Sequence, residues 1–155
     1  MRCNVGVDPR LLVDQHLVAE STELKMVPGM MRYRIDMEQK FGKSPESFRL
    51  GKGHVLFFTD KLSYLAERLC CINEEMKRRG FKPGYPDYID PYEFGDEYSN
   101  NWSPTIDDSN LIRERLVEKL LAKPPGFWRM DKEYLFEDEL DSVIGTLYSS
   151  NVCEV

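Results

Sequence analysis

Apolar side chains recur at three- and four-residue intervals in three stretches of the chain, a spacing typical of helices with one buried face. The first predicted helix covers about 8–26, with Pro9 suited to its first position. The second covers about 59–79 and is expected to stop at Gly80. The third covers about 107–123 and precedes two prolines. The pattern therefore predicts three main helices.

The segments between these helices are expected to be irregular. Pro28-Gly29 should interrupt the first helix, after which 30–42 can resume as helix. The apolar run Val55–Phe58 could be read as a strand, but it leads directly into Thr59-Asp60, a capping pair for the second helix. Residues 82–104 contain four prolines and six aromatic residues, and such aromatics can pin a long loop onto a domain.

These elements indicate an all-α fold, a compact single domain of three main helices with long irregular loops. With 155 residues and 41% hydrophobic content, the chain can bury a core of ordinary size. It has no apolar run of the ~18 residues that a membrane span needs, and its first residues lack a secretory apolar core. We therefore expect a cytoplasmic protein with no membrane partner.

Cysteine usage argues against a metal centre. Cys3, Cys70, Cys71 and Cys153 form no CxxC pair, and no histidine cluster accompanies them. We expect buried free thiols, no metal and no cofactor.

The net charge of −6 is unevenly distributed along the chain. Residues 1–82 hold 15 Lys and Arg against 11 Asp and Glu, whereas residues 83–155 hold 6 against 16. Proteins that grip duplex DNA draw much of their affinity from neutralised phosphates. An acidic second half therefore argues against non-specific scanning along DNA, although a local basic patch can still bind phosphate.

Three stretches resemble the pyrimidine-dimer DNA glycosylases of the phage endonuclease V type. They are DQHLVAE at 14–20 with Glu23-Leu24, LGKGHVLFFTDKL at 50–62 with KRRGF at 77–81, and, more weakly, RLVEK at 115–119 with Lys123-Pro124 and Trp128. The resemblance implies an endonuclease V-like helical domain over 1–134. Residues 135–155 are then an acidic C-terminal extension, expected either as a short helix against the body or as a mobile tail.

The resemblance also implies a reaction. In the family, a free N-terminal amine attacks the sugar carbon of a damaged nucleotide, and the resulting imine leads to strand cleavage. A glutamate on the first helix stabilises the charged intermediate and assists proton transfer. Met1 and Glu23 are the corresponding catalytic candidates here. An α-amine has a reference pKa of about 7.7–8.0, so a useful fraction of it is uncharged near neutral pH.

Other polar residues are candidates for ligand binding. The helical spacing of His16, Glu20 and Glu23 places all three on one helix face, which could form the floor of a site or a solvated polar stripe. The remaining candidates for anion contacts are Arg2, Lys25, Lys52 and His54. His54 could instead pack between helices.

The chain departs from the family pattern where the family holds phosphate. Thr22 and Met26 occupy positions of family arginines, and Cys3 replaces an arginine near the start. Neither Thr nor Met can reproduce the bidentate phosphate contact of a guanidinium. In addition, Arg2 after Met1 disfavours removal of the methionine, so the terminal amine is expected to be that of Met1.

Two functions follow from these observations. In the first, the protein binds or sequesters a nucleotide-type small anion, as a phage sponge for an immune signal would, with a homo-oligomer as a further expectation. In the second, it is a pyrimidine-dimer DNA glycosylase and AP lyase that acts on damaged DNA through Met1 and Glu23. The sequence leaves the identity of the ligand open.

Overall fold

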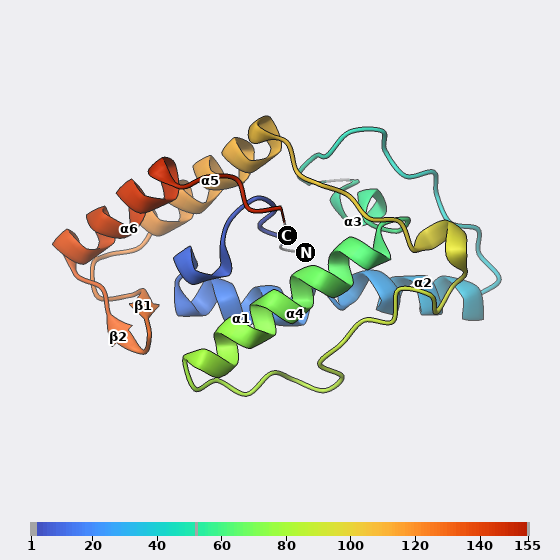
Figure 1. Ribbon diagram of the computed structural model, residues 1–155, viewed down its shortest axis with the longest axis horizontal. Helices are drawn as coiled ribbons and strands as arrows, with labels where there is room; N and C mark the ends of the chain where they lie inside the picture. Colours follow the sequence, from blue (N-terminus) through green and yellow to red (C-terminus); the bar gives the residue numbers. More distant parts are fainter. Residues whose placement is uncertain (1–2, 52, 155) are drawn as a thin grey trace.

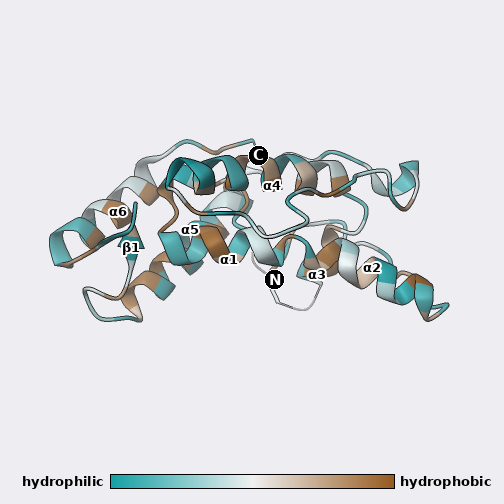
Figure 2. Ribbon diagram, turned by 90° about the horizontal axis from the view of Figure 1, so that it is seen from below, coloured by the Kyte–Doolittle hydropathy of each residue, from teal (hydrophilic) through white to brown (hydrophobic). Residues whose placement is uncertain are grey.

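The computed structural model describes residues 3–51 and 53–154, which are mostly helical, as the sequence predicted (Figure 1). The helices are α1 (Asp14–Glu23), α2 (Met26–Asp36), α3 (His54–Phe57), α4 (Leu62–Arg78), α5 (Ile106–Leu121) and α6 (Glu137–Ser149). Two short strands, β1 (Arg129–Met130) and β2 (Glu133–Tyr134), pair antiparallel. Figures 1 and 2 place α2 and α6 at opposite ends of the molecule, with α1 and α4 between them.

Helix α4 is the longest helix of the described residues and packs against α1 (Figure 1). Its apolar face is buried as the spacing predicted, and Gly80 ends it with a φ of +73°. The predicted capping pair is wrong, because neither side chain caps α4. The Thr59 hydroxyl donates to the Leu56 carbonyl at 2.8 Å, and Asp60 pairs with Lys61 at 2.7 Å.

The first predicted helix is divided in the structure. Asp8 does accept from the Arg10 amide, but it caps only a 3-10 turn, Pro9–Leu11, and α1 begins at Asp14. The reason is the buried guanidinium of Arg79. Its nitrogen atoms donate to the carbonyl of Leu12 at 2.7 Å and to that of Arg10 at 3.1 Å. These two carbonyls therefore accept hydrogen bonds from a side chain that is distant in sequence.

Helix α2 runs through Pro28-Gly29, so the predicted interruption at these residues is also wrong. Pro28 lies in the first turn of α2, where a missing N–H costs no helical hydrogen bond. The break falls instead at Leu24 and Lys25, between α1 and α2. Helix α2 ends at Asp36, before the predicted end near Gly42.

The C-terminal third matches the prediction for α5 and adds elements beyond it. A reciprocal capping box between Thr105 and Asp108 starts α5 within two residues of the predicted position. Helix α6 packs on α5 and buries Leu140 and Leu147, so most of the last stretch adopts the helical alternative. The description as three main helices therefore omits α6, and the β1–β2 pair is a small addition to a mostly helical fold.

Part of the 82–104 loop is pinned by aromatic contacts. Trp102 stacks on Phe48 with ring centroids 5.8 Å apart and lies edge-on to Phe57 and Tyr64. Tyr85, by contrast, is 92% exposed. Tyr98 lies edge-on to Phe41 at 5.4 Å, and Phe94 is packed against the core. The later aromatic residues of the loop are therefore held against the core, whereas Tyr85 is not.

The cysteines are free thiols, but the expectation that all four are buried is wrong. Cys3 is buried, Cys70 is exposed, and Cys71 and Cys153 are partly exposed. Within residues 3–51 and 53–154, no helix is long and apolar enough to cross a membrane.

A buried ion pair joins α1 and α4. The carboxylate of Glu20 lies 2.9 Å from Nε of Arg68, and both side chains are fully buried. The Asn4 amide and side chain donate to the two Glu20 oxygens at 2.9 and 2.6 Å, and Arg68 donates to the Val7 carbonyl at 2.7 Å. Burial opposes the charge on Arg68, yet the attraction of Glu20 raises its pKa. The pair therefore holds the segment from Asn4 to Val7 against both helices.

Replacing Arg68 with alanine should lower the free energy of unfolding by about 3–5 kcal/mol, because Glu20 would remain buried and uncompensated. Urea unfolding of the purified variant measures this loss. The matched control is Arg10→Ala, which breaks a pair with Asp8 in which the Arg10 side chain is 73% exposed. That change should cost much less than the loss of Arg68, because solvent screens an exposed ion pair. Equal losses in the two variants would contradict the assignment of Arg68 as a buried anchor.

Candidate functional site

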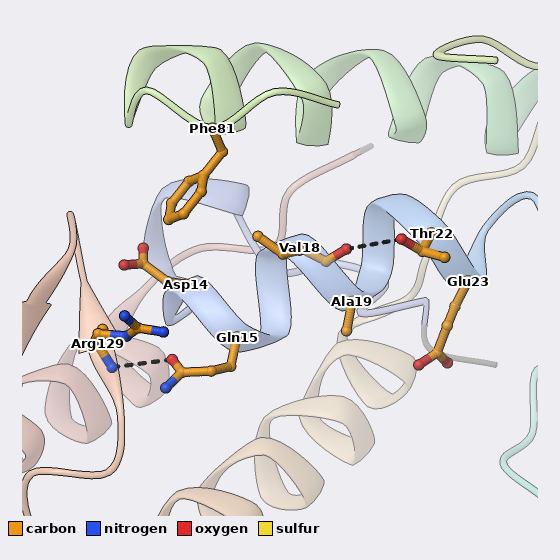
Figure 3. Close-up of a pocket in the computed structure, with 8 residues that line it drawn as sticks. All are labelled: Asp14, Gln15, Val18, Ala19, Thr22, Glu23, Phe81 and Arg129. Atoms are coloured by element: carbon orange, nitrogen blue, oxygen red, sulfur yellow. Dashed lines mark hydrogen bonds between the residues drawn. The ribbon is translucent and has the colours of Figure 1, made fainter. Parts of the chain in front are cut away.

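A pocket of about 580 Å³ runs along one side of α1 (Figure 3). Its apolar surface comes from Val18, Ala19 and Phe81. Figure 3 shows Asp14 and Arg129 at one end of α1 and Glu23 at the other. The pocket therefore combines an apolar wall with carboxylates at both ends and a guanidinium at one of them.

Gln15 on α1 binds residues 127–129, which lead into β1. Its Nε2 donates to the Phe127 carbonyl at 2.8 Å, and its Oε1 accepts from the Arg129 amide at 3.1 Å. Figure 3 shows the second of these bonds. Because both polar groups of one side chain are used, the position of residues 127–129 depends directly on α1.

A second pocket, of about 400 Å³, shares Gln15 with the first. It is lined by Gln15, His16, Lys119, Ala122, Lys123, Phe127 and Trp128. The rings of His16 and Trp128 lie 4.7 Å apart, and the Trp128 indole donates to the Leu120 carbonyl at 3.0 Å. The amine of Lys123 lies 5.2 Å from the centre of the Phe127 ring. This pocket therefore presents aromatic rings beside two lysines, a composition suited to a base and a phosphate.

The structure separates three residues that the sequence analysis placed on one face. Glu23 is partly exposed and lines the first pocket, whereas His16 lines the second. Glu20 opens onto neither, because its two oxygens are bonded to Asn4 and Arg68 in the interior. The three therefore do not form a common floor.

Two further candidates are held by backbone carbonyls. The amine of Lys25 donates to the carbonyls of Gly84 and Pro86, both at 3.0 Å, and so ties the α1–α2 turn to the 82–104 loop. The Nδ1 of His54 donates to the Arg49 carbonyl at 2.9 Å, and its ring lies edge-on to Phe48 and Phe58. Burial lowers the pKa of His54, which fits a neutral imidazole packed in an aromatic core.

The remaining candidates, Met1, Arg2 and Lys52, lie outside the described residues. Cys3, where the resemblance places an arginine, is 1% exposed, and burial followed by the charge of Glu20 raises the pKa of its thiol. Thr22 lines the first pocket without a positive charge. Positions 3 and 22 therefore cannot hold phosphate as arginines would.

Sequence reasoning missed Gln15, Phe81, Arg129 and the role of Arg68. Arg68 had a detectable signal, because it stands beside Leu65 and Leu69 on the apolar face of a helix. A charged residue on such a face requires a buried partner. Arg129 had no comparable signal, since it reaches the pocket only through contacts with a helix far away in sequence.

The family model for pyrimidine dimer DNA glycosylases matches residues 2–88. This range includes α1 with Glu23, the buried Glu20–Arg68 pair and the whole of α4. The chain therefore belongs to the pyrimidine dimer DNA glycosylase family. The second pocket's lysines and Trp128 lie outside the matched range.

The lowered pKa of His54 predicts a pH-dependent stability. Below about pH 6.5 the imidazole is protonated in the unfolded chain, whereas in the folded protein it stays neutral to a lower pH. The free energy of unfolding should therefore fall as the pH drops from about 7 towards the pKa of the folded protein. Urea unfolding between pH 7.5 and 5.5 measures the slope. His54→Asn keeps a donor for the Arg49 carbonyl and should reduce the slope in this window. Identical slopes in the two proteins would contradict the assignment.

Proposed function

We propose that this protein acts on damaged or abasic DNA by imine chemistry, with a terminal amine as nucleophile and Glu23 as the assisting carboxylate. Membership in the glycosylase family supports this class of substrate. The observation that carries the proposal is the attachment of Asn4 to Glu20, three residues before Glu23 on α1.

Chain geometry connects that attachment to the chemistry. An amine at residue 1 is three residues from Asn4 and so within about 11 Å of it along an extended chain. Glu23 lies about 4.5 Å along the helix axis from Glu20. The stretch of chain from Asn4 to residue 1 is therefore longer than this axial offset, which supports the pairing proposed for the amine and Glu23.

The proposed reaction requires only groups of this kind. The uncharged amine attacks the sugar carbon that carries the damaged base, and the base leaves with the bonding electrons. The Glu23 carboxylate balances the positive charge of the imine and accepts the proton whose loss starts strand cleavage. Val18 and Phe81 add apolar surface to the same pocket.

Phosphate contacts are proposed to come from cationic side chains that line the two pockets. Thr22 and Met26 supply no charge, whereas Lys119 and Lys123 line the second pocket and Arg129 the first. Few cationic contacts imply weak binding that salt weakens only modestly, because the salt dependence scales with the number of phosphates neutralised.

Borohydride reduction of the enzyme with an abasic-site duplex tests the proposal. The wild-type protein should form a covalent adduct, and Glu23→Gln should reduce the rate of strand cleavage by about 100-fold or more. Glu46→Gln, a change at a 92% exposed glutamate, should leave both unchanged. A Gly-Ser extension before Met1 should reduce adduct formation by displacing the amine. Absence of any adduct and of DNA binding at low salt would contradict the proposal.

A second candidate function is retention of a nucleotide-type anion in the pocket that contains His16 and Trp128. The observation that favours it is the pairing of aromatic rings with Lys119 and Lys123 in about 400 Å³, the volume range of small-ligand sites. A sponge for a nucleotide immune signal is one form of this function. It requires no reaction at Glu23.

Mass spectrometry of the ligand released on denaturing the purified protein distinguishes this candidate. A co-purified nucleotide should be present in the wild-type protein and in Glu23→Gln, and lost in the double variant Lys119→Gln, Lys123→Gln. The control is Lys43→Gln, at a lysine that is 89% exposed and does not line the pocket. Calorimetric titration with a cyclic dinucleotide gives an independent measure. No released nucleotide and no heat of binding would contradict retention.

A further inference from the structure

Two thiols that are far apart in sequence line the same pocket. Cys71 on α4 and Cys153 in the segment after α6 both border a space of about 410 Å³, together with Pro9 and Arg10. Both thiols are partly exposed, so small oxidants can reach them. Neither belongs to the pockets along α1.

Backbone contacts hold the two thiols against one N-terminal loop. The Cys153 amide donates to the Gly6 carbonyl at 3.0 Å, and Arg68, one turn before Cys71 on α4, donates to the Val7 carbonyl at 2.7 Å. The carbonyl of Asn151 accepts from Arg113 at 3.0 Å. Adjacent carbonyls of the same loop therefore position α4 and the C-terminal segment.

Burial raises the pKa of the Cys71 thiol. Cys71 is therefore a protonated thiol in the resting protein, whose oxidation depends on a minor thiolate fraction.

We propose that Cys71 and Cys153 form an oxidative cross-linking site for hydrogen peroxide. The thiolate of one cysteine attacks a peroxide oxygen, the O–O bond breaks, and a sulfenic acid and water result. The second thiol attacks that sulfur, the S–O bond breaks, and a second water leaves as the disulfide forms. Two thiols lose two electrons in all, and one peroxide gains them. The step is independent of the chemistry proposed at Glu23.

Cys3 and Cys70 cannot form this cross-link. Cys3 is 1% exposed and lies in the core beside Glu20. Cys70 is exposed but does not line this pocket, and its thiol instead lies 3.8 Å from the Glu74 carboxylate. Neighbouring residues on a helix point about 100° apart, so Cys70 faces away from Cys153.

The cross-link would fix the C-terminal segment to α4. The segment around Cys153 lies outside regular secondary structure, so it can adjust to the ~4.4–6.8 Å separation of Cα atoms that a disulfide needs. The bond would close a long loop of chain and restrict the unfolded state. Oxidised protein should therefore melt at a higher temperature, by about 5 °C or more.

Peptide mapping of the full-length protein after peroxide treatment, without reduction, tests the proposal. The expected product is an intramolecular Cys71–Cys153 peptide pair that reduction separates. Cys70→Ser should give the same pair and the same rise in melting temperature, whereas Cys71→Ser should give neither. A Cys70–Cys153 pair, only intermolecular disulfides, or oxidation of both thiols to sulfinic acid without a cross-link would overturn it.

Discussion

Glu20 and Arg68 are both removed from solvent, and two buried charges are stable together only when their remaining donors and acceptors also find partners. Asn4 and Val7 supply those partners from the N-terminal segment. The N-terminal segment, α1 and α4 therefore each need the other two to satisfy this buried pair. The pocket beside Glu23 depends on the same contact, because Val18 and Phe81 face each other only while α4 lies on α1.

Arg79 is a second buried arginine with buried partners, and it acts at the start of α1. Its guanidinium is buried at the end of α4, where it pairs with Asp14 at 2.9 Å and Glu75 at 2.6 Å. It also binds the carbonyl of Leu12, which keeps the preceding residues out of the helix. Arg68 of α4 and Arg79, the residue that follows this helix, thus determine where the N-terminal chain is extended and where it becomes helical.

Periodicity was sufficient for the buried faces of α4 and α5, and Gly80 ends α4 as predicted. The starts of both helices were less well predicted, because the Thr59-Asp60 pair does not cap α4 and Thr105 caps α5. It failed at the start of α1, where contacts from Arg79 rather than local preference determine the boundary. It also failed at Pro28, which lies in the first turn of α2 and does not interrupt it. The resemblance identified Glu23, which lines a pocket. Helical spacing could not reveal that the Glu20 carboxylate pairs with a buried arginine. Nor could it reveal that β1 contributes to the pocket lining, since both features depend on contacts between distant segments.

The side chain of Gln15 has a consequence for the relation between the two pockets. Since its amide holds residues 127–129 from both of its polar ends, the same short segment is a wall of each pocket. Loss of this one side chain would therefore change the lining of both pockets at once, although they open on different faces of the same short segment.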